Sequence, residues 1–464
     1  MSRSKGKAQT AFVCQSCGAV FPRWLGRCSS CGEWSSVVEE RIVKPTTVSS
    51  RGSPQGGGRT LKLERIADVR ADDARRYPTG IGELDRALGG GPVAGGVILL
   101  GGDPGIGKST LMMQALAALA HRGHRALYLT GEESAAQVAL RTRRIGGEAI
   151  ESVQLLATNS LEDAEVAIMQ VEPDVVVVDS IQTVRAEELS SPMGSVGQLR
   201  EATSRLIDLA KRRHIAMFLI GHITKEGTIA GPKVLEHLVD TVLSFEGDRS
   251  HAFRLIRASK NRFGPAQEVG VFEMVREGLR EVPDPSALFL AERPRNASGS
   301  VVSATAEGTR PLLVEVQALV APAVYGSARR VASGFDQHRL AILLAVLERK
   351  CGLQIGDHDV FASLAGGMRV DERAVDLALA VAIASSFRNQ PSPADLVIFG
   401  EVGLAGEVRS VPRASQRVLE AKKLGFSTIV MPLLSTEQLS DYERDGVRIL
   451  PARTLEEAID LALG

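Results

Sequence analysis

The strongest chemical pattern in the sequence is a phosphate-binding loop, which reads Gly102, Asp103, Pro104, Gly105, Ile106, Gly107, Lys108 and Ser109. Glycines at this spacing let backbone N–H groups close around a phosphate at a helix N-terminus, where unpaired donors and the helix dipole favour anions. We expect Lys108 to reach the β- and γ-phosphates of a nucleotide and the Ser109 hydroxyl to ligate Mg²⁺. The pattern therefore predicts binding of ATP together with Mg²⁺.

Acidic residues placed after apolar runs fit hydrolysis of that nucleotide. Asp179 ends a run of four valines, where an acid that coordinates Mg²⁺ belongs. Glu132 is the predicted general base, with Glu133 as the alternative, although both can instead cap the helix expected from Ser134 onward. His222 ends another apolar run, where it can sense the γ-phosphate and relay its loss or have no such role.

A second chemical pattern is formed by four of the five cysteines, which make two Cys-x-x-Cys pairs with ten residues between them: Cys14, Cys17, Cys28 and Cys31. Two such turns present four thiolates to one tetrahedral Zn²⁺, and because all four positions are cysteines the metal is expected to be structural. Disulfides are the alternative, which the absence of a secretory leader disfavours. Trp24 and Trp34 flank this unit, where they can stack on a base or cover a small core.

The elements that must position these residues alternate between short apolar runs and helical stretches. Strands are expected at 97–101, 126–130, 153–157, 175–180 and 215–222. Fully apolar strands that alternate with helices predict a parallel sheet covered on both faces, with the helix 110–120 directly after the phosphate-binding loop. The chain after this region continues to Gly464 with Ala- and Val-rich helical periods of its own. This remainder is long enough to form an independent α/β domain.

Length and composition limit the class of protein. A chain of 464 residues is longer than a single hydrophobic core usually supports, so several domains are expected. Its 55 basic and 55 acidic side chains cancel, although residues 1–60 are basic on balance and form an arm that can track phosphates or simply be solvated. No apolar run is long enough to span a bilayer, so we expect a cytoplasmic protein without membrane contact.

Several motifs together resemble the bacterial RadA family, also called Sms. They are the cysteine finger 14–31, GGDPGIGKST at 101–110, TGEES at 130–134, VVVVDS at 175–180, GHITKEG at 221–227 and KNRFG at 260–264. The resemblance is collinear along essentially the whole chain. It implies a RecA-like ATPase core and a C-terminal domain similar to the proteolytic domain of Lon. It also implies a homohexameric, DnaB-like motor that acts with RecA on single-stranded and branched DNA and drives branch migration in double-strand-break repair.

With the resemblance, the chain is predicted to divide into four parts. They are a C4 zinc finger (1–40), a linker (41–75), a RecA-like P-loop ATPase domain (76–285) and a Lon-protease-like α/β domain (286–464). The linker prediction depends on a stretch rich in Pro, Ser, Thr and Gly without periodicity.

Basic residues in turns and loops supply further candidates. In KNRFG, Lys260 and Arg262 follow an expected strand beside a turn glycine, and such a cationic tip can enter a neighbouring subunit's nucleotide site as arginine fingers do. A solvated turn is the alternative. Arg185, Lys225 and Lys233 lie in polar segments after strand ends and are the predicted DNA contacts, because the corresponding loops of RecA-like ATPases line the DNA channel.

The C-terminal domain poses a choice between function classes. Its segments resemble those of Lon that carry the catalytic Ser and Lys, but the two positions are occupied here by Asp376 and Ser415. A Ser–Lys dyad needs a hydroxyl nucleophile and an amine that can lose its proton, so we predict no proteolysis. A DNA-dependent motor is favoured, and a Lon-like protease and an ATP-controlled scaffold without motor activity are the alternatives.

Overall fold

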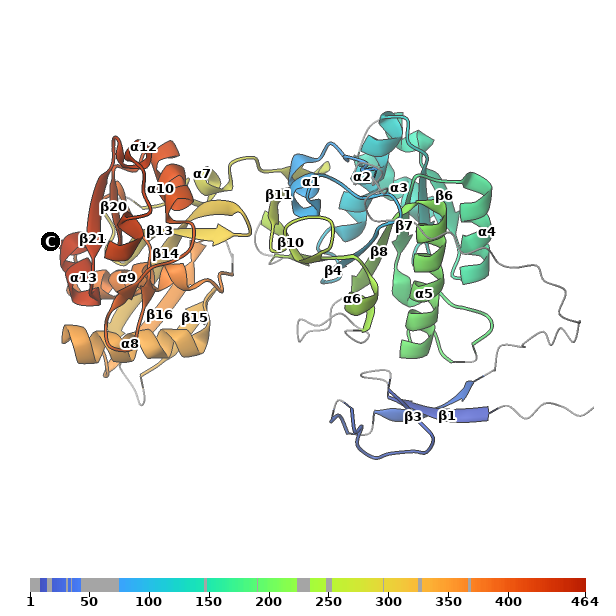
Figure 1. Ribbon diagram of the computed structural model, residues 1–464, viewed down its shortest axis with the longest axis horizontal. Helices are drawn as coiled ribbons and strands as arrows, with labels where there is room; N and C mark the ends of the chain where they lie inside the picture. The colour runs from blue at the N-terminus through green and yellow to red at the C-terminus, as the bar shows by residue number, and fades with distance from the viewer. Residues whose placement is uncertain are drawn as a thin grey trace, which may run out of the picture. The chain divides into compact units, whose positions relative to one another are not determined.

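The computed structural model divides the chain into two compact units, Met1–Glu246 with Arg254–Glu281 and Gly247–Phe253 with Val282–Gly464 (Figure 1). The residues that it describes are 9–14, 19–30, 32–34, 36–42, 75–145, 148–189, 191–222, 234–247, 253–294, 296–323, 328–365 and 369–464. In these ranges no helix is long and apolar enough to cross a membrane. Most of the expected linker lies outside them, and the four-part division of the chain stays a prediction.

The N-terminal ribbon is an antiparallel sheet in the order β2-β1-β3. Its strands are β1 (Gln9–Cys14), β2 (Val20–Phe21) and β3 (Val37–Ile42). Cys14 and Cys28 are buried together with Val37, and Phe12, Ala19, Phe21 and Leu25 pack against them. The core of this small sheet is therefore built around cysteines.

The larger sheet of the first unit has the strand order β12-β11-β10-β9-β4-β8-β7-β5-β6. Its strands are β4 (Val97–Gly102), β5 (Ala126–Thr130), β6 (Gln154–Ala157), β7 (Val175–Asp179), β8 (Ala216–His222), β9 (Thr241–Glu246), β10 (Phe253–Asn261), β11 (Val269–Val275) and β12 (Gly278–Glu281). The strands from β4 to β9 run parallel, which confirms the predicted parallel sheet. The antiparallel pairs β9–β10 and β11–β12 extend it beyond the prediction, because their connections are too short for a parallel crossover.

Helices cover both faces of this sheet (Figure 1). They are α1 (Gly82–Leu88), α2 (Lys108–His121), α3 (Ala135–Ile145), α4 (Leu161–Val171), α5 (Val196–Arg213) and α6 (Val234–Leu238). Alternate residues of each central parallel strand enter two separate cores: Ile98 and Leu100 pack with α2, and Val97 and Leu99 pack with α4 and α5. This alternation explains why the central strands are apolar at every position.

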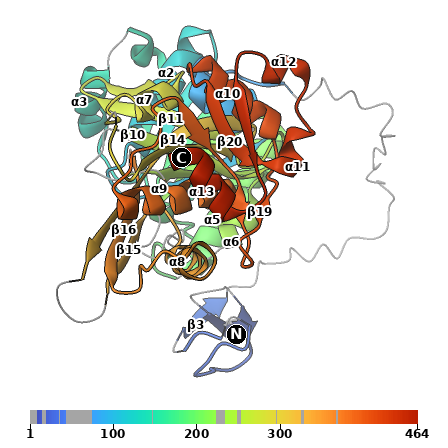
Figure 2. The ribbon, with the colours of Figure 1, turned by 90° about the vertical axis from the view of Figure 1, so that its left-hand side faces the viewer.

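The second unit is built on a mixed sheet in the order β15-β16-β14-β13-β17-β20-β21. Its strands are β13 (Ser300–Glu307), β14 (Arg310–Pro322), β15 (Arg330–Ser333), β16 (His358–Leu364), β17 (Leu396–Ile398), β20 (Thr428–Pro432) and β21 (Arg448–Ala452), with β18 (Glu401–Val402) and β19 (Val408–Arg409) as a separate hairpin. Its helices are α7 (Pro285–Phe289), α8 (Gln337–Cys351), α9 (Asp376–Arg388), α10 (Ala414–Lys423), α11 (Leu433–Thr436), α12 (Asp441–Arg444) and α13 (Leu455–Leu463). Helix α9 packs against β13, β14 and α13 (Figure 2), and its residues from Asp376 to Ser385 are all buried.

Candidate functional site

The phosphate-binding loop joins the end of β4 to the start of α2, as predicted for a P-loop. Gly107 precedes the helix with a φ of 118°, a conformation that side chains rarely adopt. A Cβ on Gly107 would lie 2.9 Å from Met274 Cε, and one on Gly102 would lie 2.8 Å from the carbonyl oxygen of Phe245. The loop is therefore a tight cradle that only glycines can form, which fits a phosphate held by backbone N–H groups.

Lys108 is the first residue of α2 and is almost completely buried. Its ammonium donates to the carbonyl oxygens of Gly102 at 2.7 Å and Asp103 at 2.9 Å, so the side chain lies back along the loop. Burial lowers the pKa of this amine, and the carboxylate of Asp179 is the strongest influence in the opposite direction. Among the described residues, carbonyls and an imidazole contact this buried cation directly, so it is suited to receive an anionic ligand.

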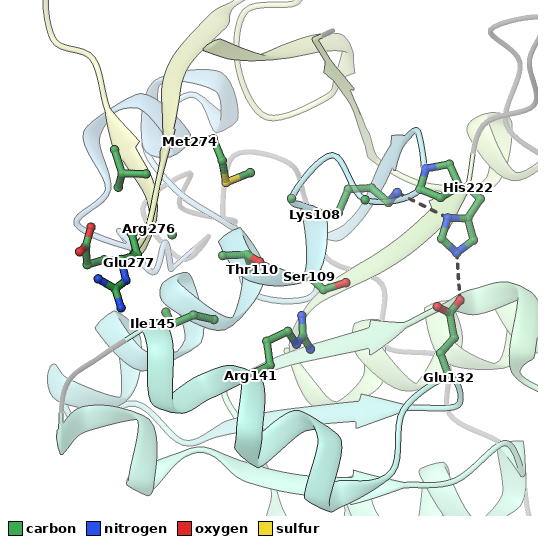
Figure 3. Close-up of a pocket in the computed structure, with 15 residues that line it drawn as sticks. Lys108, Ser109, Thr110, Glu132, Arg141, Ile145, His222, Met274, Arg276 and Glu277 are labelled. Carbon is green, nitrogen blue, oxygen red and sulfur yellow. Dashed lines mark hydrogen bonds and ion pairs between the residues drawn. The ribbon is translucent and has the colours of Figure 1, made fainter. Parts of the chain in front are cut away.

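Glu132, His222 and Lys108 form a chain of contacts at the carboxyl ends of the parallel strands β5, β8 and β4 (Figure 3). His222 Nε2 lies 2.9 Å from Glu132 Oε1, and His222 Nδ1 lies 3.5 Å from Lys108 Nζ. A neutral imidazole with its proton on Nε2 can donate to the carboxylate and accept from the ammonium. The bond from His222 lowers the pKa of Glu132, and a second bond from the Ser180 hydroxyl acts in the same direction. Glu132 is therefore held as an anion beside the P-loop.

The alternative reading of Glu132 and Glu133 as helix caps is not what the contacts indicate. The N–H of Gln137 is bonded to the Ser134 hydroxyl, and the Gln137 side chain accepts from Ser134, so these two residues close the start of α3. Glu133 instead pairs with Arg141 at 2.8 Å. Glu132, by contrast, is bonded to the His222 side chain that contacts Lys108.

Asp179 is buried at the end of β7 and accepts a hydrogen bond from the hydroxyl of Tyr128. Arg141 donates to the same phenol oxygen at 3.1 Å. Burial and the neighbouring Asp179 raise the pKa of Tyr128, so the phenol stays protonated and acts as the donor. Neither Tyr128 nor Arg141 was predicted from the sequence, although a lone tyrosine in an otherwise aliphatic strand indicates a phenol that needs a partner.

Lys108, Glu132, His222 and Arg141 open onto one pocket with a volume of about 480 Å³, whereas Asp179 and Tyr128 are buried behind it (Figure 3). The P-loop, Glu132 and His222 line one part of it. The other part is lined by residues of α3 and of the β11–β12 hairpin, which the sequence analysis also missed: Arg141, Ile145, Met274, Val275, Arg276, Glu277 and Gly278. A pocket that continues from a phosphate cradle to a partly apolar wall has the form expected for a whole nucleotide.

Lys260 and Arg262 lie at the opposite edge of the sheet from their own P-loop. Strand β10 runs antiparallel to β9 and pairs Asn261 with Thr241, which in turn pairs with Ile98 near the start of β4. The P-loop follows the other end of β4. These two cations therefore do not meet the nucleotide pocket of the same chain.

The two cations of this turn differ in their surroundings. The Lys260 ammonium donates to the carbonyl oxygens of Glu236 at 2.8 Å and Val239 at 2.6 Å, at the end of α6. Burial and the nearby Arg262 lower its pKa. The Arg262 side chain is 55% exposed and lies 3.4 Å from the Asp240 carboxylate, with which it forms an ion pair. Arg262 is thus the cation that needs less rearrangement to reach a partner.

Of the predicted DNA contacts, the structure describes Arg185, whereas Lys225 and Lys233 lie outside the described residues. Arg185 is exposed after the end of β7, at the same edge of the sheet as the P-loop. The segment that follows it is held by Gln198, whose buried amide bonds to the backbone of Ala186, Leu189 and Ser191. Arg185 therefore lies at the start of an ordered loop.

The cysteine finger contains two matching turns, one after Cys14 and one after Cys28. The N–H of Cys14 donates to Ala19 at 2.9 Å and that of Cys28 donates to Glu33 at 2.8 Å, five residues on in both cases. Cys17 and Cys31 lie outside the described residues, so the predicted four-thiolate site is described at two of its positions. The N–H of Ser30 donates to the Cys28 sulfur at 3.4 Å, the kind of bond that supports a metal-bound thiolate. These residues fit a structural Zn²⁺.

The two tryptophans of the finger do not cover its core. Trp24 is 60% exposed and Trp34 is 69% exposed. The guanidinium of Arg27 lies 5.6 Å from the Trp34 ring centroid and donates to the Gly32 carbonyl at 2.8 Å. The interpretation of a covering role is therefore wrong, because Phe12, Phe21 and Leu25 fill that place.

In the second unit, the two positions predicted to correspond to the Lon dyad, Asp376 and Ser415, have structural partners. Asp376 is buried at the start of α9 and receives two bonds from Arg339, which also donates to Val402 at 2.7 Å. Burial raises the pKa of Asp376, and Arg339 opposes this shift. Ser415 donates to the carbonyl oxygen of Gln438 at 3.2 Å.

The fold and the site together define a RecA-like P-loop ATPase with an N-terminal zinc ribbon and a Lon-like C-terminal domain. A model of AAA domains matches residues 63–228, a model of the rubredoxin metal-binding domain matches 12–39, and a model of the ChlI subunit of Mg-chelatase matches 311–434. The AAA domain implies ATP and Mg²⁺ as ligands, and the ribbon implies Zn²⁺.

Full-length relatives define the family more narrowly. DNA repair protein RadA of Bacillus subtilis is 46% identical over 460 residues, 99% of both chains, and the protein of that name from Pseudomonas aeruginosa is 48% identical over 454 residues, 98% of this chain and 99% of its own. The chain belongs to the RadA family of DNA repair proteins. Among solved structures, a KaiC-like protein from Pyrococcus horikoshii OT3 is 20% identical, with a TM-score of 0.38, and the match covers 45% of this chain and all of that one.

Proposed function

We propose that this chain is a DNA-dependent ATPase that acts as a branch-migration motor with RecA on recombination intermediates in double-strand-break repair. The observation that supports this most is the chain of contacts from Glu132 through His222 to Lys108. It joins the candidate base, the candidate phosphate ligand and the end of β8. The segment after β8 carries two of the predicted DNA contacts, so the state of the nucleotide can be passed to a DNA-binding loop.

The residues of the pocket divide the work of hydrolysis. Residues 102–107 wrap the phosphates, and Lys108 leaves the loop carbonyls to bind the β- and γ-phosphates. Mg²⁺, when bound by Ser109 and Asp179, neutralises charge on the phosphates. Glu132 accepts a proton from the attacking water, a role that its depressed pKa and its bond to His222 support because both keep it anionic.

Further parts of the proposal concern neighbouring molecules. Rings of subunits place a nucleotide between two chains, so Lys260 and Arg262 of one subunit would act on the nucleotide of the next. Their position away from their own P-loop supports this role. We propose a homohexamer that binds single-stranded and branched DNA through Arg185, Lys225 and Lys233.

In this proposal the C-terminal unit is a structural or DNA-binding platform that helps to assemble the ring, and it is not a protease. Asp376 offers a carboxylate already paired with Arg339 where a nucleophilic hydroxyl is needed. Ser415 offers a hydroxyl where the dyad needs an amine. We therefore expect no peptidase activity with ATP, with DNA or with both, and no labelling of Ser415 by a serine-directed covalent probe.

An ATPase assay with and without single-stranded DNA tests the function. Wild-type protein is expected to hydrolyse ATP faster with DNA and to extend strand exchange on RecA-made intermediates, whereas Lys108→Ala is expected to lose both activities. ATP turnover that DNA does not change would favour the scaffold alternative. Digestion of casein would favour the protease.

A further inference from the structure

Tyr128 lies behind the predicted Mg²⁺ ligand on the neighbouring strand. In the register of β5 and β7, Tyr128 is paired with Val177 and Thr130 with Asp179. Because side chains two residues apart share a face of a sheet, Tyr128 and Asp179 project to the same side, where α2 covers them. The Tyr128 hydroxyl donates to Asp179 Oδ2.

A fully buried phenol at this place needs an explanation, because an aliphatic residue would fill the strand equally well. Tyr128 has no exposed surface, and its oxygen both donates to Asp179 and accepts from Arg141 Nη2 at 3.1 Å. Arg141 is in turn fixed by the Glu133 carboxylate at 2.8 Å. The phenol is therefore held on one side by an ion pair and directs its single proton at the carboxylate on the other.

We infer that Tyr128 is a positioning residue that fixes the Asp179 carboxylate for Mg²⁺, with Arg141 holding the phenol in place. This inference rests on the proposed function, since it takes Asp179 as a Mg²⁺ ligand. Mg²⁺ tolerates little departure from octahedral geometry, so the rotation of a ligating carboxylate matters. The hydrogen bond from the Tyr128 hydroxyl to Asp179 Oδ2 fixes the rotation of that carboxylate. Outer-sphere partners of this kind typically change metal affinity about 10- to 100-fold when they are removed.

Direct binding of Mn²⁺, used as the probe, to full-length protein saturated with ADP tests the inference. Electron paramagnetic resonance measures the Mn²⁺ that stays free. Tyr128→Phe removes one oxygen atom and keeps the ring, so the sheet should remain packed. We expect Mn²⁺ to bind roughly ten-fold more weakly to this variant. Tyr77→Phe is the matched control, since Tyr77 is also buried in this unit but packs against His124 instead. It should bind Mn²⁺ like the wild type.

Binding of a fluorescent nucleotide in excess EDTA separates positioning of the metal from distortion of the pocket. Tyr128→Phe should bind the metal-free nucleotide like the wild type. Unchanged Mn²⁺ affinity in Tyr128→Phe would overturn the inference, and so would an equal loss of nucleotide affinity with and without metal. Lys108→Ala tests the underlying site separately: if it binds nucleotide as well as the wild type, the nucleotide site itself is wrongly assigned, whatever Tyr128→Phe does.

Discussion

Replacing Arg262 by alanine should abolish turnover while leaving the fold almost unchanged. In its own chain the half-exposed Arg262 pairs with the buried Asp240, whose carboxylate also accepts from the N–H of Val97 at 3.1 Å, so loss of the guanidinium should cost only about 1 kcal/mol of the free energy of unfolding. In the proposed ring the same guanidinium stabilises the transition state of the neighbour's nucleotide, where an arginine finger is worth roughly 10³-fold or more in kcat. A large loss of kcat with a small loss of stability is the expected combination.

Arg262 cannot supply this effect within its own subunit. The residues of β4 before Gly102 separate the start of that strand, near Arg262, from the P-loop, a distance of roughly 17 Å at ~3.3 Å per residue. Activity should therefore return when Arg262→Ala is mixed with Lys108→Ala. In equal mixtures about one quarter of the interfaces combine an intact Lys108 with an intact Arg262 from the neighbour, so up to about a quarter of wild-type ATPase activity should return.

The assay is steady-state ATP hydrolysis with single-stranded DNA, on rings shown by native mass spectrometry to contain both variants. Each variant alone is the control. If mixed rings stay as inactive as the separate variants, action in trans is refuted. Arg262 is better suited to this test than Lys260, because removal of Lys260 also releases the carbonyl oxygens at the end of α6.

Cys28→Ala should lose Zn²⁺ and unfold the ribbon while the ATPase unit stays folded, and metal analysis with proteolysis checks this; a full zinc complement would contradict it. Glu132→Gln should lower kcat by roughly 10²- to 10⁴-fold while nucleotide still binds, as single-turnover hydrolysis and nucleotide titration will show. Because the bond from His222 lowers the pKa of Glu132, His222→Ala should raise that pKa and move the acid limb of the kcat profile to higher pH; an unmoved limb argues against Glu132 as the base. Arg339→Ala should destabilise the second unit by about 3–5 kcal/mol in urea unfolding, since Asp376 would be left buried without its partner.

The P-loop and the central strands could be predicted because their information is local. Eight consecutive residues define the loop, and uninterrupted valine or leucine runs define strands that are buried on both faces. The turn at Gly107 needs no knowledge of the rest of the chain to be recognised.

The remaining parts of the site depend on the order of strands in the sheet, which no local pattern encodes. Tyr128 meets Asp179 across 51 residues of sequence because β5 lies beside β7. The wall from Met274 to Gly278 comes from a hairpin far along the chain, in the antiparallel extension that was not predicted. The partners of Lys260 were missed for the same reason, since its contacts are backbone carbonyls of another element.

The ion pair between Asp376 and Arg339 also limits which single substitutions the second unit can tolerate. A change of Asp376 to serine, the residue that the Lon resemblance calls for at this position, would leave the Arg339 guanidinium facing a hydroxyl, and the hydroxyl at position 415 would still be no base. At least three positions must change together, and the first step in most orders lowers the stability of the unit. Any order of single substitutions that removes this pair therefore passes through a variant in which one buried charge has lost its partner, and that variant is less stable than the present chain.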